Sequence, residues 1–394
     1  MNQFEETKTI TLHHGDCLKA MDLMPENSVD AIVTDPPYHF VSIVKRFGKE
    51  GSAPAQFGTD GAFARASRGF MGKEWDGGDI AFRPETWAKA LRVLKPGGHI
   101  VAFGAPKNYH RLACAIEDAG FELRDSLMWV FGTGFPKSMD VSKAIDKASG
   151  AEREVIGENP NHRSVSGVSY EGVYAGANTG SALITAPATD EAKQWAGWGT
   201  ALKPAFEPIV LARKPLSEKT VAANVLRWGT GAINIDGCKV GAGEPRKTQT
   251  GGMGRKANPV YGAFVQSETE SIETTQGRWP ANLAHDGSEE VLDLFPKDAG
   301  RFFYSAKANK ADRAGSKHPT VKPVALMQWL VRMVTPPGGT ILDPFAGSGT
   351  TAQAAINEGF NPIIVERESE YVTDIKNRFE GKCKVDVLEV EVRS

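Results

Sequence analysis

The sequence contains few cysteines, no long apolar run and no marked excess of either charge. Its four cysteines, Cys17, Cys114, Cys238 and Cys383, are scattered without a Cys-x-x-Cys pair, so neither a zinc site nor a disulfide framework is predicted. The histidines also lack Cys or His companions at the spacing of metal ligands, and we expect no metal. No apolar run approaches the length of a membrane span, and the first residues do not resemble a signal peptide, so we expect a cytoplasmic protein.

The composition is that of an ordinary globular protein. With 394 residues, 41% of them hydrophobic, the chain is long enough for a large core and an added domain. The net charge of −2 gives no overall attraction to nucleic acid, but basic residues gather in two stretches. These are Lys307, Lys310, Arg313, Lys317 and Lys322, and, in a Gly-rich segment, Arg246, Lys247, Arg255 and Lys256. Each stretch is either a phosphate-contacting face or a solvated basic loop.

Two short motifs lie near opposite ends of the chain. Asp35-Pro36-Pro37-Tyr38 follows the apolar run at 29–33, and Asp343-Pro344-Phe345-Ala346-Gly347-Ser348-Gly349-Thr350-Thr351 follows the run at 340–342. Each run is typical of a buried parallel strand, and each motif stands where the strand gives way to a loop. Open α/β sheets bind their ligands at such positions.

The glycine motif predicts an adenosine site. Gly347 and Gly349 let the backbone approach a ligand closely, and a helix that starts at Thr350 is expected to stop at Gly359. The next strand pattern ends at Glu366, about 20 residues beyond the first glycine, the spacing at which an acid reaches ribose hydroxyls in dinucleotide folds. No Gly-Lys-Ser/Thr follows, which disfavours a Walker-type phosphate loop. The alternative is a tight strand-to-helix turn with an incidental surface Glu.

The proline motif predicts a rigid acceptor for an amine. Pro36 and Pro37 fix φ, so the Asp35 carboxylate, the Pro36 carbonyl and the Tyr38 ring would have a fixed relation. Two acceptors on the N–H groups of an aromatic amine would expose its lone pair for in-line attack on a methyl group. Stacking on Tyr38 would add about 1–3 kcal/mol, which offsets much of the cost of flipping a base. A simple proline turn is the alternative.

Together these motifs resemble those of the bacterial and phage DNA amino-methyltransferases of the permuted β group, most closely the N6-adenine enzymes. Two further segments carry the resemblance, 14–18 (His-Gly-Asp-Cys-Leu) and 303–323 with Phe-Tyr-Ser-Ala-Lys and His-Pro-Thr-Val-Lys-Pro. The resemblance implies that the catalytic residues are Asp35, Pro36, Pro37 and Tyr38. It implies S-adenosylmethionine as cofactor, bound by Asp16, Lys307, His318, Thr320, Lys322, Asp343, Phe345, Ala346, Gly347, Ser348, Gly349, Thr350, Thr351 and Glu366.

The resemblance also implies a fold and partners. We expect an α/β protein with a Rossmann-like methyltransferase sheet and an inserted target-recognition region, in which the strands that precede Asp35 and Pro344 are neighbours at a switch point. Double-stranded DNA is the expected substrate. A homodimer, common in the group, and a cognate restriction endonuclease are left open. No cysteine follows a proline, so transfer to carbon through a Pro-Cys nucleophile is disfavoured.

The chain divides into three predicted blocks. Residues 1–135 form the catalytic half, 136–300 an inserted region, and 301–394 the cofactor half. Within the inserted region, about 205–214 completes the catalytic sheet and mainly 215–300 recognises the target, with 140–200 as a contributor. In the first block we expect a helix at 83–94, which stops before Pro96-Gly97-Gly98, and strands at 99–103 and 122–130. Residues 38–75 form either a lid over DNA or a disordered insertion.

Three other functions remain open. N4-cytosine methylation uses the same chemistry, but in the resembled family it usually accompanies Ser in place of Asp35. Methylation of RNA or of a protein amine would use the same planar acceptor turn. A catalytically silent DNA-binding protein would keep the fold, although the intact Asp35, Tyr38 and Glu366 argue against it.

Overall fold

The computed structural model describes residues 8–38, 79–132, 134, 138–159, 183–241, 246–250, 270–293, 295, 302–305, 307–316, 318 and 320–390. The chain forms two compact units. The first combines Met1–Pro36, Ile80–Val130 and Glu207–Ser394, and the second combines Pro37–Asp79 and Phe131–Phe206. No helix in the described ranges is long and apolar enough to cross a membrane.

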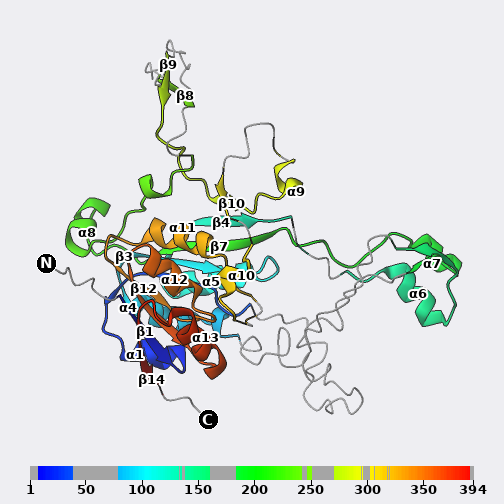
Figure 1. Ribbon diagram of the computed structural model, residues 1–394, viewed down its shortest axis with the longest axis horizontal. Helices are drawn as coiled ribbons and strands as arrows, with labels where there is room; N and C mark the ends of the chain where they lie inside the picture. The colour runs from blue at the N-terminus through cyan, green and yellow to red at the C-terminus, as the bar shows by residue number, and fades with distance from the viewer. Residues whose placement is uncertain are drawn as a thin grey trace. The chain divides into compact units, whose positions relative to one another are not determined.

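The first unit is built on a ten-stranded sheet with the order β11-β10-β4-β7-β3-β2-β12-β13-β1-β14 (Figure 1). The strands are β1 (Thr9–His14), β2 (Val29–Thr34), β3 (Leu94–Phe103), β4 (Glu122–Val130), β7 (Phe206–Arg213), β10 (Leu283–His285), β11 (Phe303–Tyr304), β12 (Thr340–Asp343), β13 (Asn361–Glu366) and β14 (Lys384–Glu389). Every neighbouring pair with a defined register is parallel except β3 and β7, which are antiparallel. This confirms the expected α/β class.

Helices pack on both faces of this sheet. The longer ones are α1 (Cys17–Leu23), α4 (Pro84–Val93), α5 (Tyr109–Asp118), α8 (Val221–Trp228), α11 (Val324–Val334), α12 (Thr350–Asn357) and α13 (Ser369–Phe379), and the short ones are η3 (Ile80–Phe82), η4 (Asp236–Cys238), α9 (Glu289–Leu292) and α10 (Lys310–Arg313). Alternation along β13 separates two cores. Val365 joins the core that includes α1, α4 and α5, whereas Ile364 joins the core with α12 and α13.

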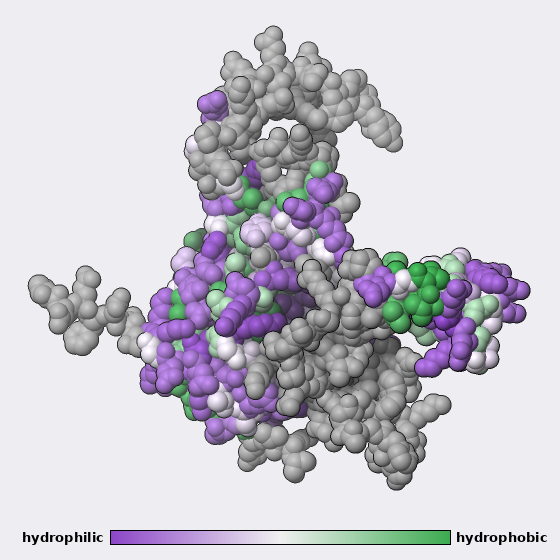
Figure 2. All heavy atoms as spheres, turned by 45° about the vertical axis from the view of Figure 1, so that its right-hand side comes forward, coloured by the Kyte–Doolittle hydropathy of each residue, from purple (hydrophilic) through white to green (hydrophobic). Residues whose placement is uncertain are grey.

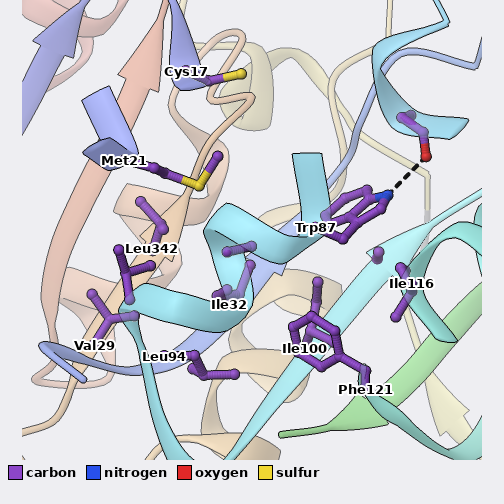
Figure 3. Packing of buried hydrophobic residues seen from close by; sticks show 14 of the residues in the cluster. Cys17, Met21, Val29, Ile32, Trp87, Leu94, Ile100, Ile116, Phe121 and Leu342 are labelled. Atoms are coloured by element: carbon purple, nitrogen blue, oxygen red, sulfur yellow. Dashed lines mark hydrogen bonds between the residues drawn. The ribbon is translucent and has the colours of Figure 1, made fainter. Parts of the chain in front are cut away.

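Trp87 of α4 lies at the centre of the larger core. Its side chain is fully buried, and its indole Nε1 donates a hydrogen bond of 2.8 Å to the Ala81 carbonyl oxygen (Figure 3). Ile32 of β2 and Ile100 of β3 lie in the same cluster, so the strand that leads to Asp35 is packed on its helical face. Burying a Trp and branched side chains here makes this part of the sheet a rigid support.

The predicted strands at 122–130 and 206–213 have the same bounds as β4 and β7, and α4 matches the predicted helix within one residue at each end. The prediction for β3 was wrong at its start, because the strand begins at Leu94 and not at His99. Pro96, Gly97 and Gly98 are accommodated by a register shift against β2, where Leu94 pairs with Val29 and His99 with Ala31. A Cβ on Gly98 would lie 2.9 Å from the Asp30 carbonyl oxygen, so only glycine permits this approach.

The second unit contains a small helix and hairpin module. It consists of α6 (Val141–Ser149), β5 (Val155–Glu158), β6 (Leu183–Thr185) and α7 (Asp190–Gln194). The buried Asp146 carboxylate joins them, because it binds Arg153 Nη1 at 2.5 Å and accepts from the backbone N–H groups of Ala188 and Thr189. Hydrophobic surface gathers on this module in Figure 2, where Ile156 of β5 is 61% exposed.

Several predictions concern the inserted region and the lid segment, which the structure describes only in part. Within the inserted region the structure describes a hairpin of β8 (Arg246–Thr250) and β9 (Glu270–Thr274). Most of the lid segment, 39–75, and residues 161–182 lie outside the described residues. The lid and the division of the chain into three functional blocks therefore stay predictions.

Candidate active site

The two motifs meet at a switch point of the sheet. β12 and β2 are adjacent and parallel, with Ile341 beside Ala31 and Leu342 beside Ile32. From this pair the strand order runs in opposite directions, from β12 to β13 on one side and from β2 to β3 on the other. The carboxyl ends of both strands therefore lie at one edge of the sheet, which confirms the predicted adjacency.

Asp343, the last residue of β12, connects the elements at this edge. Its Oδ1 accepts hydrogen bonds from Thr34 Oγ1 at 2.7 Å and from the Phe345 N–H at 3.1 Å, and its Oδ2 accepts one from Thr351 Oγ1 at 2.5 Å. The residue is 2% exposed. Burial raises the pKa of this carboxyl to about 6, against the lowering effect of its hydrogen bonds, and the charge of Asp35 raises it further. Asp343 thus fixes the end of β2 and the start of α12 to its own strand.

The glycine loop is shaped by two left-handed residues, Gly347 at φ +52° and Gly349 at φ +78°. The Gly347 N–H donates a 2.7 Å hydrogen bond to Glu366 Oε2, at the end of β13. A Cβ on Gly347 would lie 3.1 Å from His318 Nε2, so the loop and the histidine approach closely. Arg378 of α13 is buried and donates from Nε to the Ser348 carbonyl oxygen at 2.7 Å. The loop is therefore preorganised and presents backbone and not side chains.

Glu366 is 8% exposed, and its two carboxylate oxygens bind backbone. Besides the bond from Gly347, Oε1 accepts the Glu368 N–H at 2.8 Å. Burial raises the pKa of Glu366 to about 7, although the hydrogen bonds from Glu368 and Gly347 lower it. A carboxylate has about four lone-pair sites, so this group can still accept hydroxyl donors.

Asp16 is brought beside Glu366 by the sheet. β1 pairs with β13 so that His14 stands opposite Glu366, and Asp16 follows two residues later as the N-cap of α1. Its Oδ1 accepts the N–H groups of Leu18 and Lys19, each at 3.0 Å. Two acids that follow neighbouring parallel strands can reach different parts of one nucleoside.

The segment before α11 contributes His318, Thr320 and Lys322. His318 is 9% exposed, packs edge-on against Tyr371 with ring centres 4.5 Å apart, and its Nδ1 accepts the Thr320 N–H at 3.3 Å. Its contact with Gly347 places this segment against the glycine loop. Lys307, by contrast, is exposed.

Asp35 follows β2 and pairs with Lys322, whose Nζ lies 2.7 Å from Asp35 Oδ2. A second carboxylate, Glu207 Oε2, is 3.1 Å from the same nitrogen. Pro36 is buried, whereas Pro37 and Tyr38 are half-buried and belong to the second compact unit. The structure thus joins Asp35 to the predicted cofactor segment, and the stacking role of Tyr38 stays a prediction.

Sequence reasoning missed three residues that complete this edge, Glu207, Thr34 and Arg378. Glu207 offers a signal, because it is an acid at the start of an otherwise apolar strand beside Pro208. Thr34 and Arg378 offer no such signal in the sequence, because the residues they bind are far away along the chain.

Comparisons with known proteins agree with the geometry. A family model described as DNA methylase, covering N6 and N4 methyltransferases, matches residues 29–377. The type II methyltransferase M.HindIII of Haemophilus influenzae is 24% identical over 361 residues, 87% of this chain and 86% of that protein. The M1.HpyAVI–SAM complex is 18% identical, with a TM-score of 0.41 over 94% of this chain and 98% of that chain. The cytosine-N4-specific PvuII DNA methyltransferase is 14% identical, with a TM-score of 0.42 over 96% and 90%.

Proposed function

Because this chain belongs to the DNA methylase family of N6 and N4 amino-methyltransferases, we propose that it methylates the N6 amine of adenine in double-stranded DNA. The observation that carries the proposal is the meeting of Asp35 with the glycine loop at the switch point between β2 and β12. A proposed acceptor for an amine and a proposed binding loop for an adenosyl group then follow neighbouring parallel strands, the arrangement that direct transfer requires.

S-adenosylmethionine, the methyl donor of this family, supplies an electrophilic methyl group on a sulfonium sulfur. Its site fits the residues present. Gly347 and Gly349 leave room where side chains would intrude, and Glu366 provides an acceptor for the ribose hydroxyls. Asp16 would contact the adenine, while His318 and Thr320 flank the loop on the side of the methionine part. Asp343 would act indirectly, because its carboxylate is engaged with Thr34 and Thr351.

Asp35 and the Pro36 carbonyl would accept the two N–H groups of the target amine and direct its lone pair to the methyl carbon. As the N–C bond forms, the S–C bond breaks, and the methylated amine then loses a proton to solvent or to Asp35. Tyr38 would stack on the flipped base. The exposed cations Lys307 and Lys310 would contribute to a phosphate-binding face, and residues of about 215–300 to target recognition.

Adenine is preferred over cytosine because the first motif residue is Asp35. In the families that resemble this chain, Ser usually takes that place in N4-cytosine enzymes. This preference rests on the family resemblance at one position and has a direct test.

The test is mass spectrometry of nucleosides from duplex DNA incubated with the protein and isotopically labelled S-adenosylmethionine. Label in N6-methyladenine is the expected result. Label in N4-methylcytosine would keep the mechanism and reverse the base, and absence of label from the DNA with cofactor still bound would reject DNA as the substrate. Asp35→Ala should lower the rate at least about 10²–10³-fold while cofactor affinity is retained. Equal loss of both would contradict the division of roles.

A further inference from the structure

Lys322 lies where three neighbouring strands of the sheet converge, although it belongs to the segment before α11. Its Nζ contacts Asp35 at 2.7 Å, beyond the end of β2, and Glu207 at 3.1 Å, at the start of β7. The same nitrogen is 4.8 Å from the centre of the Phe103 ring, at the end of β3. Since β7 runs antiparallel to β3, its first residues lie at the carboxyl end of β3, and all three contacts meet at the active edge.

We propose that Lys322 is a positioning residue for Asp35, with Glu207 as its second anchor, and does not bind the cofactor. This inference rests on the proposed function. Lys322 binds one oxygen of the Asp35 carboxylate at 2.7 Å, which restricts the rotation of the group. Because a carboxylate offers about four lone-pair sites, Asp35 can accept this ammonium and a substrate amine together.

Burial alone would lower the pKa of Lys322, but the charges of Asp35 and Glu207 raise it, and the net direction is upward. The side chain, 7% exposed, is therefore an ammonium at neutral pH. An ammonium ion so far removed from water is stable only when carboxylate partners lie close to it. The position of the Lys322 side chain is therefore tied to the positions of Asp35 and Glu207.

Glu207 determines the sign of the net charge of the cluster formed by Asp35, Lys322 and Glu207. Asp35 and Lys322 alone would cancel, whereas, counted over the described residues, two carboxylates around one ammonium leave a net negative charge. Methyl transfer moves positive charge onto the amine nitrogen, and a fixed negative group beside that nitrogen stabilises the developing charge. Among the described residues, the buried Asp343 is a further titratable group at this edge, and the charge of Asp35 contributes to raising its pKa.

The experiment compares Lys322→Gln and Glu207→Gln with the wild type on duplex DNA that the wild type methylates. The single-turnover rate constant is measured from pH 5.5 to 9, and the S-adenosylmethionine affinity is measured separately. Lys322→Gln should lower the rate about 10²–10³-fold. It should also shift the acid limb of the pH–rate profile, where the rate falls on acidification, upward by about 1–3 pH units, because Asp35 loses its neighbouring cation. Glu207→Gln should move the limb downward, because Lys322 then pairs with Asp35 alone. Cofactor affinity should not change in either variant.

Lys214→Gln is the matched control. This lysine follows β7 and is half-buried, and its Nζ donates to Asn27 Oδ1 and to the carbonyl oxygens of Leu91 and Leu94. Its loss should lower stability and leave the acid limb in place.

Two results would overturn the proposal. Loss of cofactor affinity in Lys322→Gln with an unchanged single-turnover rate would return Lys322 to cofactor binding. If both variants are slower but the acid limb of the pH–rate profile stays at the wild-type pH, the cluster of Asp35, Lys322 and Glu207 has only a structural role. Absence of methylation by the wild type is a different result, because it rejects the proposed function and this role with it.

Discussion

Asp343→Asn should stabilise the protein at alkaline pH, although it removes a buried charged group that makes three hydrogen bonds. The asparagine Oδ1 can still accept from Thr34 and from the Phe345 N–H, and its amide nitrogen can donate to Thr351 Oγ1, which is free to act as an acceptor. The hydrogen-bond number is then preserved, and the cost of burying a carboxylate is removed.

The magnitude follows from the pKa of Asp343. A carboxyl whose pKa rises from 3.8 to about 6 on folding binds more protons in the folded state, so its contribution to stability is present below pH 3.8 and is lost as the pH rises through about 6. The full loss at pH 8 is about 3 kcal/mol, of which about 1.4 kcal/mol develops between pH 5 and pH 8. The free energy of unfolding of the variant, relative to the wild type, should therefore increase by about 1.4 kcal/mol between these two pH values.

Urea unfolding at pH 5 and pH 8 measures this difference, and Asp30→Asn is the control. Asp30 is also buried, at the other end of β2, but its carboxylate pairs with Lys95 at 2.6 Å and accepts the Thr340 N–H at 2.8 Å. Removing that charge should destabilise the protein by about 1–3 kcal/mol. A constant difference between Asp343→Asn and the wild type at both pH values would refute the argument that burial of Asp343 is costly.

Two further predictions concern the glycine loop and its partner Glu366. Gly347→Ala should bind S-adenosylmethionine more weakly in equilibrium titrations than Gly359→Ala, because both have positive φ but only the first meets a neighbour, His318. Backbone strain of about 1–2 kcal/mol is common to the two variants, so equal cofactor affinities would show that the contact with His318 does not matter. Cofactor affinity should also fall about tenfold per pH unit below about 7, as the Glu366 carboxylate, which we propose accepts the ribose hydroxyls, becomes protonated. Glu366→Gln should abolish this dependence, and a pH-independent affinity in the wild type would place the ribose elsewhere.

The sequence was sufficient to predict the central strands and their adjacency. The runs that became β2 and β12 are mostly apolar and almost wholly buried, as expected of parallel strands covered on both faces, and the following motifs supply the turns. β1 was missed, although Thr9–His14 alternates in burial, because a single short strand of mixed polarity has a weak pattern without its neighbours. The antiparallel direction of β7 could not be read either, since an apolar strand carries no sign of its direction.

The site was predicted less completely than the fold. The two contiguous motifs pointed to Asp35 and to the glycine loop, and the spacing from Gly347 pointed to Glu366. Motif resemblance assigned Lys322 by its segment alone, whereas the ion pair with Asp35 joins residues that only the folded sheet brings together. The hydrogen bond that Thr34 donates to Asp343 could not be predicted from the sequence for the same reason. Short motifs report local chemistry, and the partners that tune it come from tertiary pairing.

The position of β1 has a consequence for how the protein is made. Thr11 pairs with Ile363 on one side and with Asp386 on the other, so this strand is synthesised long before either of its partners. At about 5–20 residues per second, roughly 20–75 s pass between translation of His14 and of Glu389. During that time β1 has neither of its strand partners, and such non-local pairing favours slow folding. Translation speed and chaperone access in that interval are therefore expected to affect the yield of active protein more than they would in a protein whose paired strands lie close together in the sequence.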